Sequence, residues 1–364
     1  MQKKEVINSV FNVKDFGAKG DGLAADSGAI QSALDAAGKV QGTVYFPAGK
    51  YNCHDLKVHS HTTVQALHQR TYHHHGAGAI LIMDNPDADC MLNISDTSGC
   101  HIRGIFMRGN AKLSRKKQHG ILANNATWSA GENLPVIDEI IVSDFSGHGI
   151  YLLKIKGFIV RHSRITWNRG HGVSFHGEGG FISDTYFARN EECGVTTEKY
   201  GAKVVFTGNR VEWNFAYGLS ISGDCDENDS KGWAVTGNCF DRNGGAAIFA
   251  NKVNTSSVTG NIFRRNGRKA DELLEGTEEC CHILMQSCKG LSVTGNTGWA
   301  DRDDNGKNAL TPNYVFWVKD NGSCMVTYNA FSGGYLKEMI LDKGGNKPDF
   351  IYNHNVGSLY YGKY

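Results

Sequence analysis

The sequence lacks several features, and each absence excludes a class of protein. No run of 18 apolar residues occurs, so no membrane-spanning helix and no membrane partner are expected. The opening MQKKEVINSV has no apolar stretch typical of a secretory signal, so we expect a cytoplasmic protein, or a secreted one whose signal has been removed. Charge of one sign is not in excess either, because 38 Lys and Arg balance 37 Asp and Glu. We therefore expect no nucleic-acid partner.

Proline is scarce and glycine is abundant. The chain has 5 prolines and 45 glycines in 364 residues, whereas glycine is usually about 7% of a chain. This balance excludes collagen-like and proline-rich disordered chains, and it favours an all-β protein with many turns. Ten cysteines spread over a chain of this length, without a signal, predict buried reduced thiols rather than a disulfide framework.

One stretch of sequence recurs along the chain. RITWNRGHGVSF (164–175) returns as RVEWNFAYGLSI (210–221), with YFARNEECGVTT (186–197) between them. A second series, TGN, begins at Thr207, Thr236, Thr259 and Thr294. Repeats of 20 to 30 residues indicate stacked structural units. The asparagines that define the first series are 22, 24, 29 and 23 residues apart: Asn168, Asn190, Asn214, Asn243 and Asn266.

Within each repeat, apolar and polar residues alternate with the period of a strand. Val211 and Trp213 flank Glu212, and Leu219 and Ile221 flank Ser220. The pattern predicts a right-handed parallel β-helix with three short strands per turn and turns about 4.8 Å apart. The asparagines fit the turns, where each can bond to its counterpart one turn away. Two inward columns follow: Ile165, Phe187, Val211, Phe240 and Phe263, and Ile150, Val173, Val195, Leu219 and Ile283.

The N-terminal segment predicts a helix that covers one end of the β-helix. DSGAIQSALDAAGK has a start signal at Asp26 and Ser27, apolar Ile30 and Leu34, and a stop signal at Gly38. GTVYFPAGKY (42–51) follows as the expected first strand and turn. We expect a single domain over 1–364, with a cap and first turn at about 11–51, coils at about 52–356 and a tail at 357–364.

Three segments together resemble a known family. FNVKDFGAKGDG (11–22), DSGAIQSALDAAG and GTVYFPAGKY are similar to the N-terminal signature of the pectate lyase superfamily of β-helix proteins. The resemblance is close over Phe11–Tyr51, and the repeats from about His101 to Val356 follow the general pattern of that family. It implies a carbohydrate-binding groove along the outside of the β-helix. It does not fix the reaction, because the group contains lyases, hydrolases, fructan-rearranging transferases and phage tailspike depolymerases.

The residues before the recurring asparagines form the predicted substrate-binding row. They are Trp167, Arg189, Trp213 and Arg242, followed by Arg265. Indole faces can cover sugar rings, and guanidinium groups can bind hydroxyls or carboxylates in a fork. The alternative is that the tryptophans only close the turn.

One position earlier, the repeat places two carboxylates on adjacent turns. Glu212 and Asp241 would lie about 5 Å apart, the separation of a retaining acid and nucleophile. Two carboxylates so close cannot both ionise easily, so one could donate a proton. The alternative is an outward charge pair with Arg210, Arg242 or Arg264 nearby.

A rival acid and base set lies in and near an insertion. GDCDENDSKG (223–232) lengthens one turn, and extra loops of solenoids tend to lie on the binding face. Asp224 and Asp226 from this loop, with Glu198 and Glu178 at corresponding places on preceding turns, are further candidates. His171, His176 and Glu178 complete the predicted substrate contacts.

No residue is assigned to a metal, and no cofactor is expected. DRDDNG (301–306) starts like a calcium loop, but its twelfth position is Pro312 rather than Glu, so calcium stays an option for a lyase only. The favoured function is a glycoside hydrolase or transglycosylase that uses paired carboxylates. The alternatives are a polysaccharide lyase or uronate epimerase, and a non-catalytic glycan-binding adhesin. The expected partner is a poly- or oligosaccharide, and the expected state is a monomer or a homotrimer.

Overall fold

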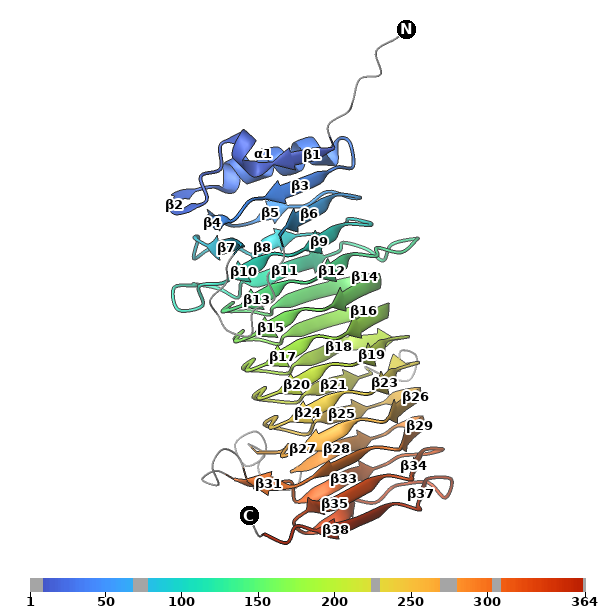
Figure 1. The fold of residues 1–364 in the computed structure, drawn as a ribbon. Coiled ribbons are helices and arrows are strands. Elements are labelled where there is room, and N and C mark those ends of the chain that lie inside the picture. The colour runs from blue at the N-terminus through green and yellow to red at the C-terminus, as the bar shows by residue number, and fades with distance from the viewer. Residues whose placement is uncertain (1–8, 68–77, 224–229, 269–279, 303–308, 363–364) are drawn as a thin grey trace. The chain divides into compact units, whose positions relative to one another are not determined.

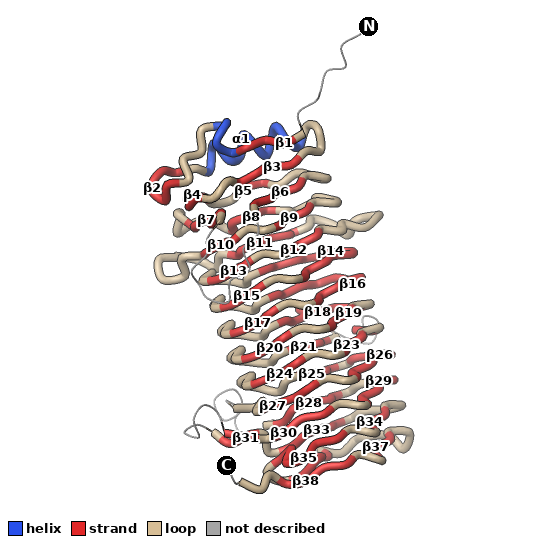
Figure 2. Tube along the Cα trace, viewed as in Figure 1, coloured by secondary structure: helices blue, strands red, loops and turns tan. Residues whose placement is uncertain are grey.

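The structure is a computed structural model that describes residues 9–67, 78–223, 230–268, 280–302 and 309–362. Almost every element in it is a short strand; one α-helix, α1 (Ser27–Gly38), and one 3-10 helix, η1 (Val13–Phe16), lie near the N-terminus (Figures 1 and 2). The described part of the chain contains no helix long and apolar enough to span a membrane. The chain forms two compact units, 1–164 and 165–364, which are described separately.

The first unit consists of three stacks of parallel strands. Each turn of the chain adds one strand to each stack, which defines a parallel β-helix. The first stack contains β2 (Asp21–Ala25), β4 (Gly49–Cys53), β7 (Ala79–Met83), β10 (Phe106–Arg108) and β13 (Ile141–Ser143). The second contains β5 (Leu56–Lys57), β8 (Cys90–Asn93), β11 (His119–Asn124) and the start of β14 (Ile150–Arg161). The third contains β1 (Val10–Asn12), β3 (Thr43–Phe46), β6 (Thr63–Ala66), β9 (His101–Arg103), β12 (Val136–Asp138) and the end of β14.

The second unit repeats this arrangement. Its first stack contains β15 (Arg164–Thr166), β17 (Tyr186–Ala188), β20 (Arg210–Glu212), β24 (Cys239–Asp241), β27 (Ile262–Arg264), β30 (Thr297–Trp299), β35 (Ala330–Tyr335) and β38 (Val356–Leu359). The second contains β16 (Val173–Ser183), β18 (Val195–Ala202), β21 (Leu219–Ser222), β25 (Ile248–Asn251), β28 (Cys281–Gln286), β33 (Tyr314–Lys319) and β36 (Glu338–Asp342). The third contains β19 (Val205–Thr207), β22 (Ser230–Lys231), β23 (Ala234–Thr236), β26 (Val253–Thr259), β29 (Lys289–Thr294), β34 (Met325–Thr327) and β37 (Ile351–Asn353). A short antiparallel pair, β31 (Asp301–Arg302) and β32 (Leu310–Thr311), lies outside the stacks.

Apolar side chains fill the interior in columns, as predicted. Phe187, Val211, Phe240 and Phe263 are direct partners on successive strands of the first stack, and all are fully buried. Rings of Phe240 and Phe263 stack with centroids 5.4 Å apart. The second predicted column is also buried, but it omitted one member, since Ile248 lies between Leu219 and Ile283.

The recurring asparagines form the predicted ladder. In the second unit, Asn168 Nδ2 donates to Asn190 Oδ1 at 3.0 Å, and Asn190 Nδ2 donates to Asn214 Oδ1 at 2.9 Å. The same bond continues through Asn243 to Asn266, and all five side chains are buried. The asparagines of the TGN series form a second ladder: Asn209, Asn238, Asn261, Asn296, Asn329 and Asn355. Buried amides therefore satisfy one another from turn to turn.

The N-terminal helix is present, although its predicted end signals act differently. Ile30, Ala33, Leu34 and Ala37 are fully buried. Asp26 makes no side-chain bond to the helix N-terminus; it accepts from the backbone N–H groups of residues 19 and 20 instead. The helix ends at Gly38, as predicted, although Gly38 is its last helical residue and Lys39 occupies the C-cap with right-handed backbone.

The first strand of the chain lies before the segment in which it was predicted. The first strand is β1, because residues 10–12 pair in parallel with 43–45, so the prediction that 42–51 opens the sheet was wrong.

The nine cysteines within the described residues are all free, and all except Cys239 are buried. Free thiols are therefore confirmed at these nine positions, and burial at eight of them.

Candidate functional site

The predicted binding residues occupy equivalent positions in the second unit. Trp167, Arg189, Trp213 and Arg242 each directly follow a strand of the first stack and precede an asparagine of the ladder. Their φ angles are 61°, 57°, 60° and 55°, in the left-handed region that side chains other than glycine rarely adopt. Each backbone N–H donates to a carbonyl of the next strand in the stack, as in Trp213 N–H to Asp241 O at 3.1 Å. We call these four residues the Trp–Arg row.

Cations and indoles alternate within the Trp–Arg row. The Arg189 Cζ atom lies 4.9 Å from the ring centroid of Trp167 and 5.0 Å from that of Trp213. Arg242 Cζ lies 4.6 Å from the Trp213 centroid. The expected continuous row is therefore confirmed, but guanidinium groups already cover the faces of Trp213. This geometry leaves the edge of Trp213 to a ligand, and its role in sugar binding stays a prediction.

Arg189 is the most available cation of the row. Its side chain is exposed, and within the described residues it has no ion pair with a carboxylate. Two flanking indoles hold its guanidinium plane, so its N–H edges are presented in a fixed orientation. A planar guanidinium held in this way suits bidentate binding of a carboxylate.

Glu212 and Asp241 are direct partners on β20 and β24, so the predicted carboxylate pair exists in space. Both are buried, with 4% and 2% of their surface exposed. Glu212 accepts a hydrogen bond from Tyr186 Oη at 2.5 Å and one from Arg210 Nε at 3.0 Å. The partner Arg210 agrees with the alternative expectation of a charge pair, but Glu212 is buried and not outward.

Asp241 is surrounded by guanidinium groups. Arg265 donates to it twice, from Nη2 at 2.7 Å and from Nε at 3.0 Å. Arg242 Nη1 lies 2.9 Å and Arg264 Nη1 3.5 Å from the same oxygen, Oδ2. A carboxylate held by three cations is well placed as a counter-ion and poorly placed to donate a proton to a substrate.

The rival acidic set does not gather around the Trp–Arg row. Glu198 is exposed on β18 and accepts from Ser174 Oγ at 3.2 Å. Glu178 on β16 accepts from Tyr200 Oη at 3.3 Å and Lys203 Nζ at 3.0 Å. These strands belong to the second stack, whereas the row follows the first stack. Asp224 and Asp226 lie outside the described residues.

The expected correspondence of Glu178 and Glu198 on adjacent turns was wrong. Phe175 pairs with Thr197 and Gly177 with Gly201, so residues 198–200 stand opposite the single residue His176. This bulge shifts the register, and the partner of Glu178 becomes Ala202. His176 is half-buried, with its ring centroid 6.2 Å from that of Tyr200. Its role and that of Glu178 in substrate binding stay predictions.

His171 lies at the turn that leads into β16. Its Nε2 forms an ion pair with Glu192 Oε2 at 2.9 Å, and its Nδ1 is 3.0 Å from the backbone nitrogen of Cys193. Burial alone would lower the pKa of His171, but the bonds to Cys193 and Glu192 outweigh it and raise that pKa to about 9. The predicted sugar contact at His171 is not tested by this geometry.

Sequence reasoning missed Trp299, which extends the site beyond the Trp–Arg row. Trp299 is 38% exposed, and Arg264 Cζ lies 4.7 Å from its ring centroid. The sequence contained a signal for it: Glu212, Asp241, Arg264 and Trp299 each stand three residues after an asparagine of the second ladder. Extending that offset by one repeat would have found it.

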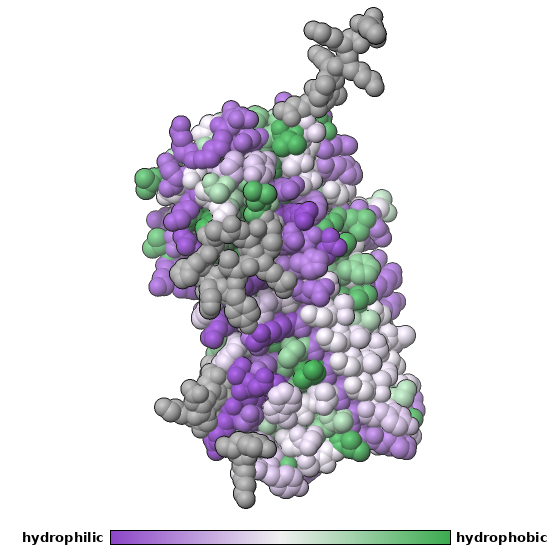
Figure 3. Space-filling model, viewed as in Figure 1, coloured by the Kyte–Doolittle hydropathy of each residue, from purple (hydrophilic) through white to green (hydrophobic). Residues whose placement is uncertain are grey.

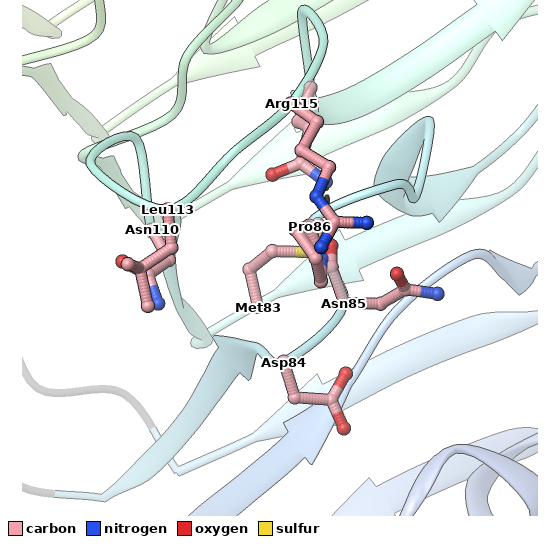
Figure 4. Close-up of a pocket in the computed structure, with 8 residues that line it drawn as sticks. Met83, Asp84, Asn85, Pro86, Asn110, Leu113 and Arg115 are labelled. Carbon is pink, nitrogen blue, oxygen red and sulfur yellow. Dashed lines mark hydrogen bonds between the residues drawn. The ribbon is translucent and has the colours of Figure 1, made fainter.

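A pocket of about 240 Å³ lies in the first unit, between the loops that follow β7 and β10 (Figure 4). Arg115 Nη1 pairs with Asp87 at 2.9 Å, and Gln118 Nε2 donates to the Asn85 carbonyl at 2.7 Å. No residue predicted from the sequence as functional lines it. The lining residues are Met83, Asp84, Asn85, Pro86, Asn110, Leu113, Arg115 and Gln118.

Two family models match the chain. One describes a right-handed β-helix region and covers residues 119–298; the other describes rhamnogalacturonase A/epimerase, pectate lyase-like proteins and covers residues 10–65. The fold is thus that of a right-handed parallel β-helix, and the match over residues 10–65 to pectate lyase-like proteins agrees with the N-terminal resemblance.

Several curated proteins match part of this chain in sequence. The plasmin and fibronectin-binding protein A of Streptococcus pneumoniae is 28% identical over 181 residues, which cover 44% of this chain and 25% of the relative. The mannuronan C5-epimerase AlgE2 of Azotobacter vinelandii is 28% identical over 235 residues, covering 58% and 22%. Alginate lyase 7 of the same bacterium is 64% identical over 42 residues, covering 11% and 5%. The matches span a quarter or less of each of these relatives.

Solved structures share the fold at low sequence identity. The A-module of the mannuronan C-5 epimerase AlgE6 from Azotobacter vinelandii has a TM-score of 0.71 at 18% identity, covering 96% of this chain and 99% of that one. PfbA, a surface adhesin of Streptococcus pneumoniae, has a TM-score of 0.69 at 15% identity, covering 98% and 93%. At these identities the likeness establishes the fold alone.

Proposed function

We propose that this chain binds and acts on an acidic polysaccharide that lies along the Trp–Arg row. The observation that carries the proposal is Arg189, an exposed guanidinium held between two indoles at 4.9 and 5.0 Å. Because the indoles fix the plane of the group, less rotational freedom is lost when it binds a carboxylate. A sugar acid fits this site better than a neutral sugar, since the ring faces of Trp213 are already covered.

The charge around the row supports an acidic ligand. Among the described residues, the ion pairs and cation–π contacts around the row involve six arginines but only two carboxylates. Positive charge gathered on one surface of a nearly neutral chain attracts anions to that surface. The arginines are Arg189, Arg210, Arg242, Arg264, Arg265 and Arg268, and the carboxylates are Glu212 and Asp241.

The relatives agree with an acidic polymer. Proteins named mannuronan C5-epimerase and alginate lyase match the chain, and the second family model includes epimerases. For the reaction, we place elimination or epimerisation of a uronate ahead of hydrolysis. Hydrolysis needs a carboxyl group free to donate a proton, whereas Glu212 and Asp241 are both buried and paired.

A second candidate is a binding protein without catalytic activity. It is favoured by the same engaged carboxylates and by the match to a fibronectin-binding surface protein. Product analysis separates the two: polymannuronate, polyguluronate and polygalacturonate are incubated with the chain, and unsaturated uronides, altered sugar stereochemistry and new reducing ends are each measured. Binding without any of these products would establish the second candidate.

Affinity measurements test the site itself. Arg189→Gln should weaken binding of an acidic polysaccharide about tenfold, because one charge-assisted contact is lost. Arg169→Gln is the matched control, since Arg169 is exposed on the turn before that of Arg189 and has no hydrogen bond or ion pair to another described residue. Equal affinity of Arg189→Gln and the wild type would contradict the proposal, and so would equal binding of neutral and acidic polymers.

A further inference from the structure

Beyond the Trp–Arg row, the arginines around Asp241 form a second cationic centre. Arg242, Arg264 and Arg265 all contact one oxygen, Asp241 Oδ2, at 2.9, 3.5 and 2.7 Å. We call these three residues the arginine cluster. Asp241 is the only carboxylate partner of Arg264 and of Arg265 within the described part of the chain. One buried anion is therefore shared among three cations.

The two outer members of the cluster are held in fixed orientations. Arg242 stacks on Trp213 at 4.6 Å and Arg264 stacks on Trp299 at 4.7 Å. Their side chains are 17% and 31% exposed, whereas that of Arg265 is 6% exposed. Arg265 thus anchors Asp241, and Arg242 and Arg264 reach the surface.

Arg264 and Arg242 also lie on adjacent turns. The backbone N–H of Arg242 donates to the carbonyl of Arg264 at 3.2 Å, and neighbouring strands of a stack are about 4.8 Å apart. Both guanidinium groups reach the same oxygen, Asp241 Oδ2, and two different indoles orient them, so they can approach one small anion from two directions. This differs from Arg189, which is a single group between two rings.

We propose that Arg242 and Arg264 bind a tetrahedral oxyanion ester, a sulfate or a phosphate, carried by the polysaccharide. A planar carboxylate pairs with one guanidinium in a common plane, whereas a tetrahedral oxyanion has oxygens directed toward both groups. The inference rests on the proposed function, because it places this ester on the polymer that lies along the Trp–Arg row. It predicts a glycan that is esterified as well as acidic.

The test compares one polymer with and without the ester. Polymannuronate and its sulfated derivative, matched in chain length, are bound at equal ionic strength. The wild type should bind the sulfated polymer about tenfold more tightly. Arg264→Gln should lose that gain, and its affinity for unsulfated polymannuronate should fall by a smaller factor than its affinity for the sulfated polymer, because one of several positive charges near the row is lost. Arg264→Lys should keep part of the gain, because it retains the charge and loses the fork.

Two controls separate specific binding from general attraction of charge. Arg169→Gln should keep the full gain, and Arg189→Gln should lower the affinity for both polymers. An equal gain in Arg264→Gln, or no gain in the wild type, would overturn the inference while leaving the proposed function in place.

A second experiment uses small anions and does not depend on binding of the polymer. Inorganic sulfate and inorganic phosphate, each compared with chloride at equal ionic strength, should raise the Tm of the wild type more than that of Arg264→Gln. The larger of the two shifts identifies which ester the site prefers. Equal shifts in both proteins would count against the inference, whereas failure of every polymer to bind would count against the proposed function.

Discussion

At the scale of single residues, the Trp–Arg row combines backbone strain with exposed function. Trp167, Arg189 and Trp213 adopt φ angles near 60° without being glycine, which costs about 1–2 kcal/mol per residue. A buried asparagine follows each of them and is bonded to its counterpart on the next turn, which supports this conformation. Strain retained at exposed, stacked side chains is typical of functional positions.

Arg189 allows stability and binding to be separated. Arg189→Gly should change the free energy of unfolding by less than about 1 kcal/mol, because relief at φ 57° offsets the lost cation–π contacts. Arg189→Ala should be less stable than Arg189→Gly, since alanine keeps the strain and also lacks the contacts. Urea unfolding measures both variants. A glycine variant less stable than the alanine variant would contradict this account of the turn.

His282 predicts how stability depends on pH. It is fully buried between Phe263 and Phe331, at centroid distances of 5.6 and 5.8 Å, and burial lowers its pKa to about 3. Below about pH 6.5, His282 is therefore protonated in the unfolded chain and stays neutral in the folded chain. Stability from this group is present above pH 6.5 and is lost as the pH falls, by about 1.4 kcal/mol per pH unit.

His282→Phe should reduce that loss. The phenyl ring continues the aromatic stack, and Asn266 keeps its bonds to the carbonyls of Phe240 and Arg264. Between pH 7 and pH 4.5, the variant should lose about 2 kcal/mol less stability than the wild type. His354→Phe, at an exposed position, is the control and should follow the wild type. Parallel pH profiles for His282→Phe and the wild type would contradict the prediction.

At the scale of elements, ladders and stacks repeat one interaction from turn to turn. Asn214 receives bonds from Asn190 and donates to Asn243, so one side chain connects three turns. The Phe187, Phe240 and Phe263 rings pack inside the same strands. Removing one step of a ladder leaves buried polar groups on the preceding turn without a partner.

Asn214→Ala should therefore be strongly destabilising. We expect a loss of about 3 kcal/mol, because the replacement removes the acceptor of the Asn190 backbone N–H and Nδ2 groups and a donor to the Phe187 carbonyl, all of them buried. Asn353→Ala, at an exposed position on β37, should change stability by less than about 0.5 kcal/mol. Thermal unfolding of both variants checks the prediction. A loss below about 1 kcal/mol for Asn214→Ala would show that the ladder follows the fold rather than supporting it.

At the scale of the whole molecule, the stacking rule explains what could be predicted from the sequence. The columns, the ladder and the Glu212–Asp241 pairing follow from a fixed repeat, and all are present. Predictions failed where the repeat is interrupted. The bulge at 198–200 shifts Glu198 away from its expected place. Trp299 escaped prediction because the candidate rows follow the first asparagine series, which ends at Asn266, whereas the TGN series continues to Asn296.

The sequence also could not show which groups the functional side chains contact. The alternation of Trp and Arg was visible in the sequence, but two findings depend on distances that the spacing of residues does not show. Arg189 lies over the indole faces, and three arginines hold Asp241.

The visible face in Figure 3 shows mostly polar and neutral residues, with its hydrophobic residues in small separate groups among those described. The single-domain expectation over 1–364, the oligomeric state, the location and the calcium option stay predictions.

The most direct test of the central claim is a crystal structure of the chain with an acidic oligosaccharide. The account predicts a sugar carboxylate within hydrogen-bonding distance of the Arg189 guanidinium, with the chain of sugars running along the Trp–Arg row. An oligosaccharide bound along β16 and β18, or in the pocket beside Arg115, with Arg189 untouched, would contradict it.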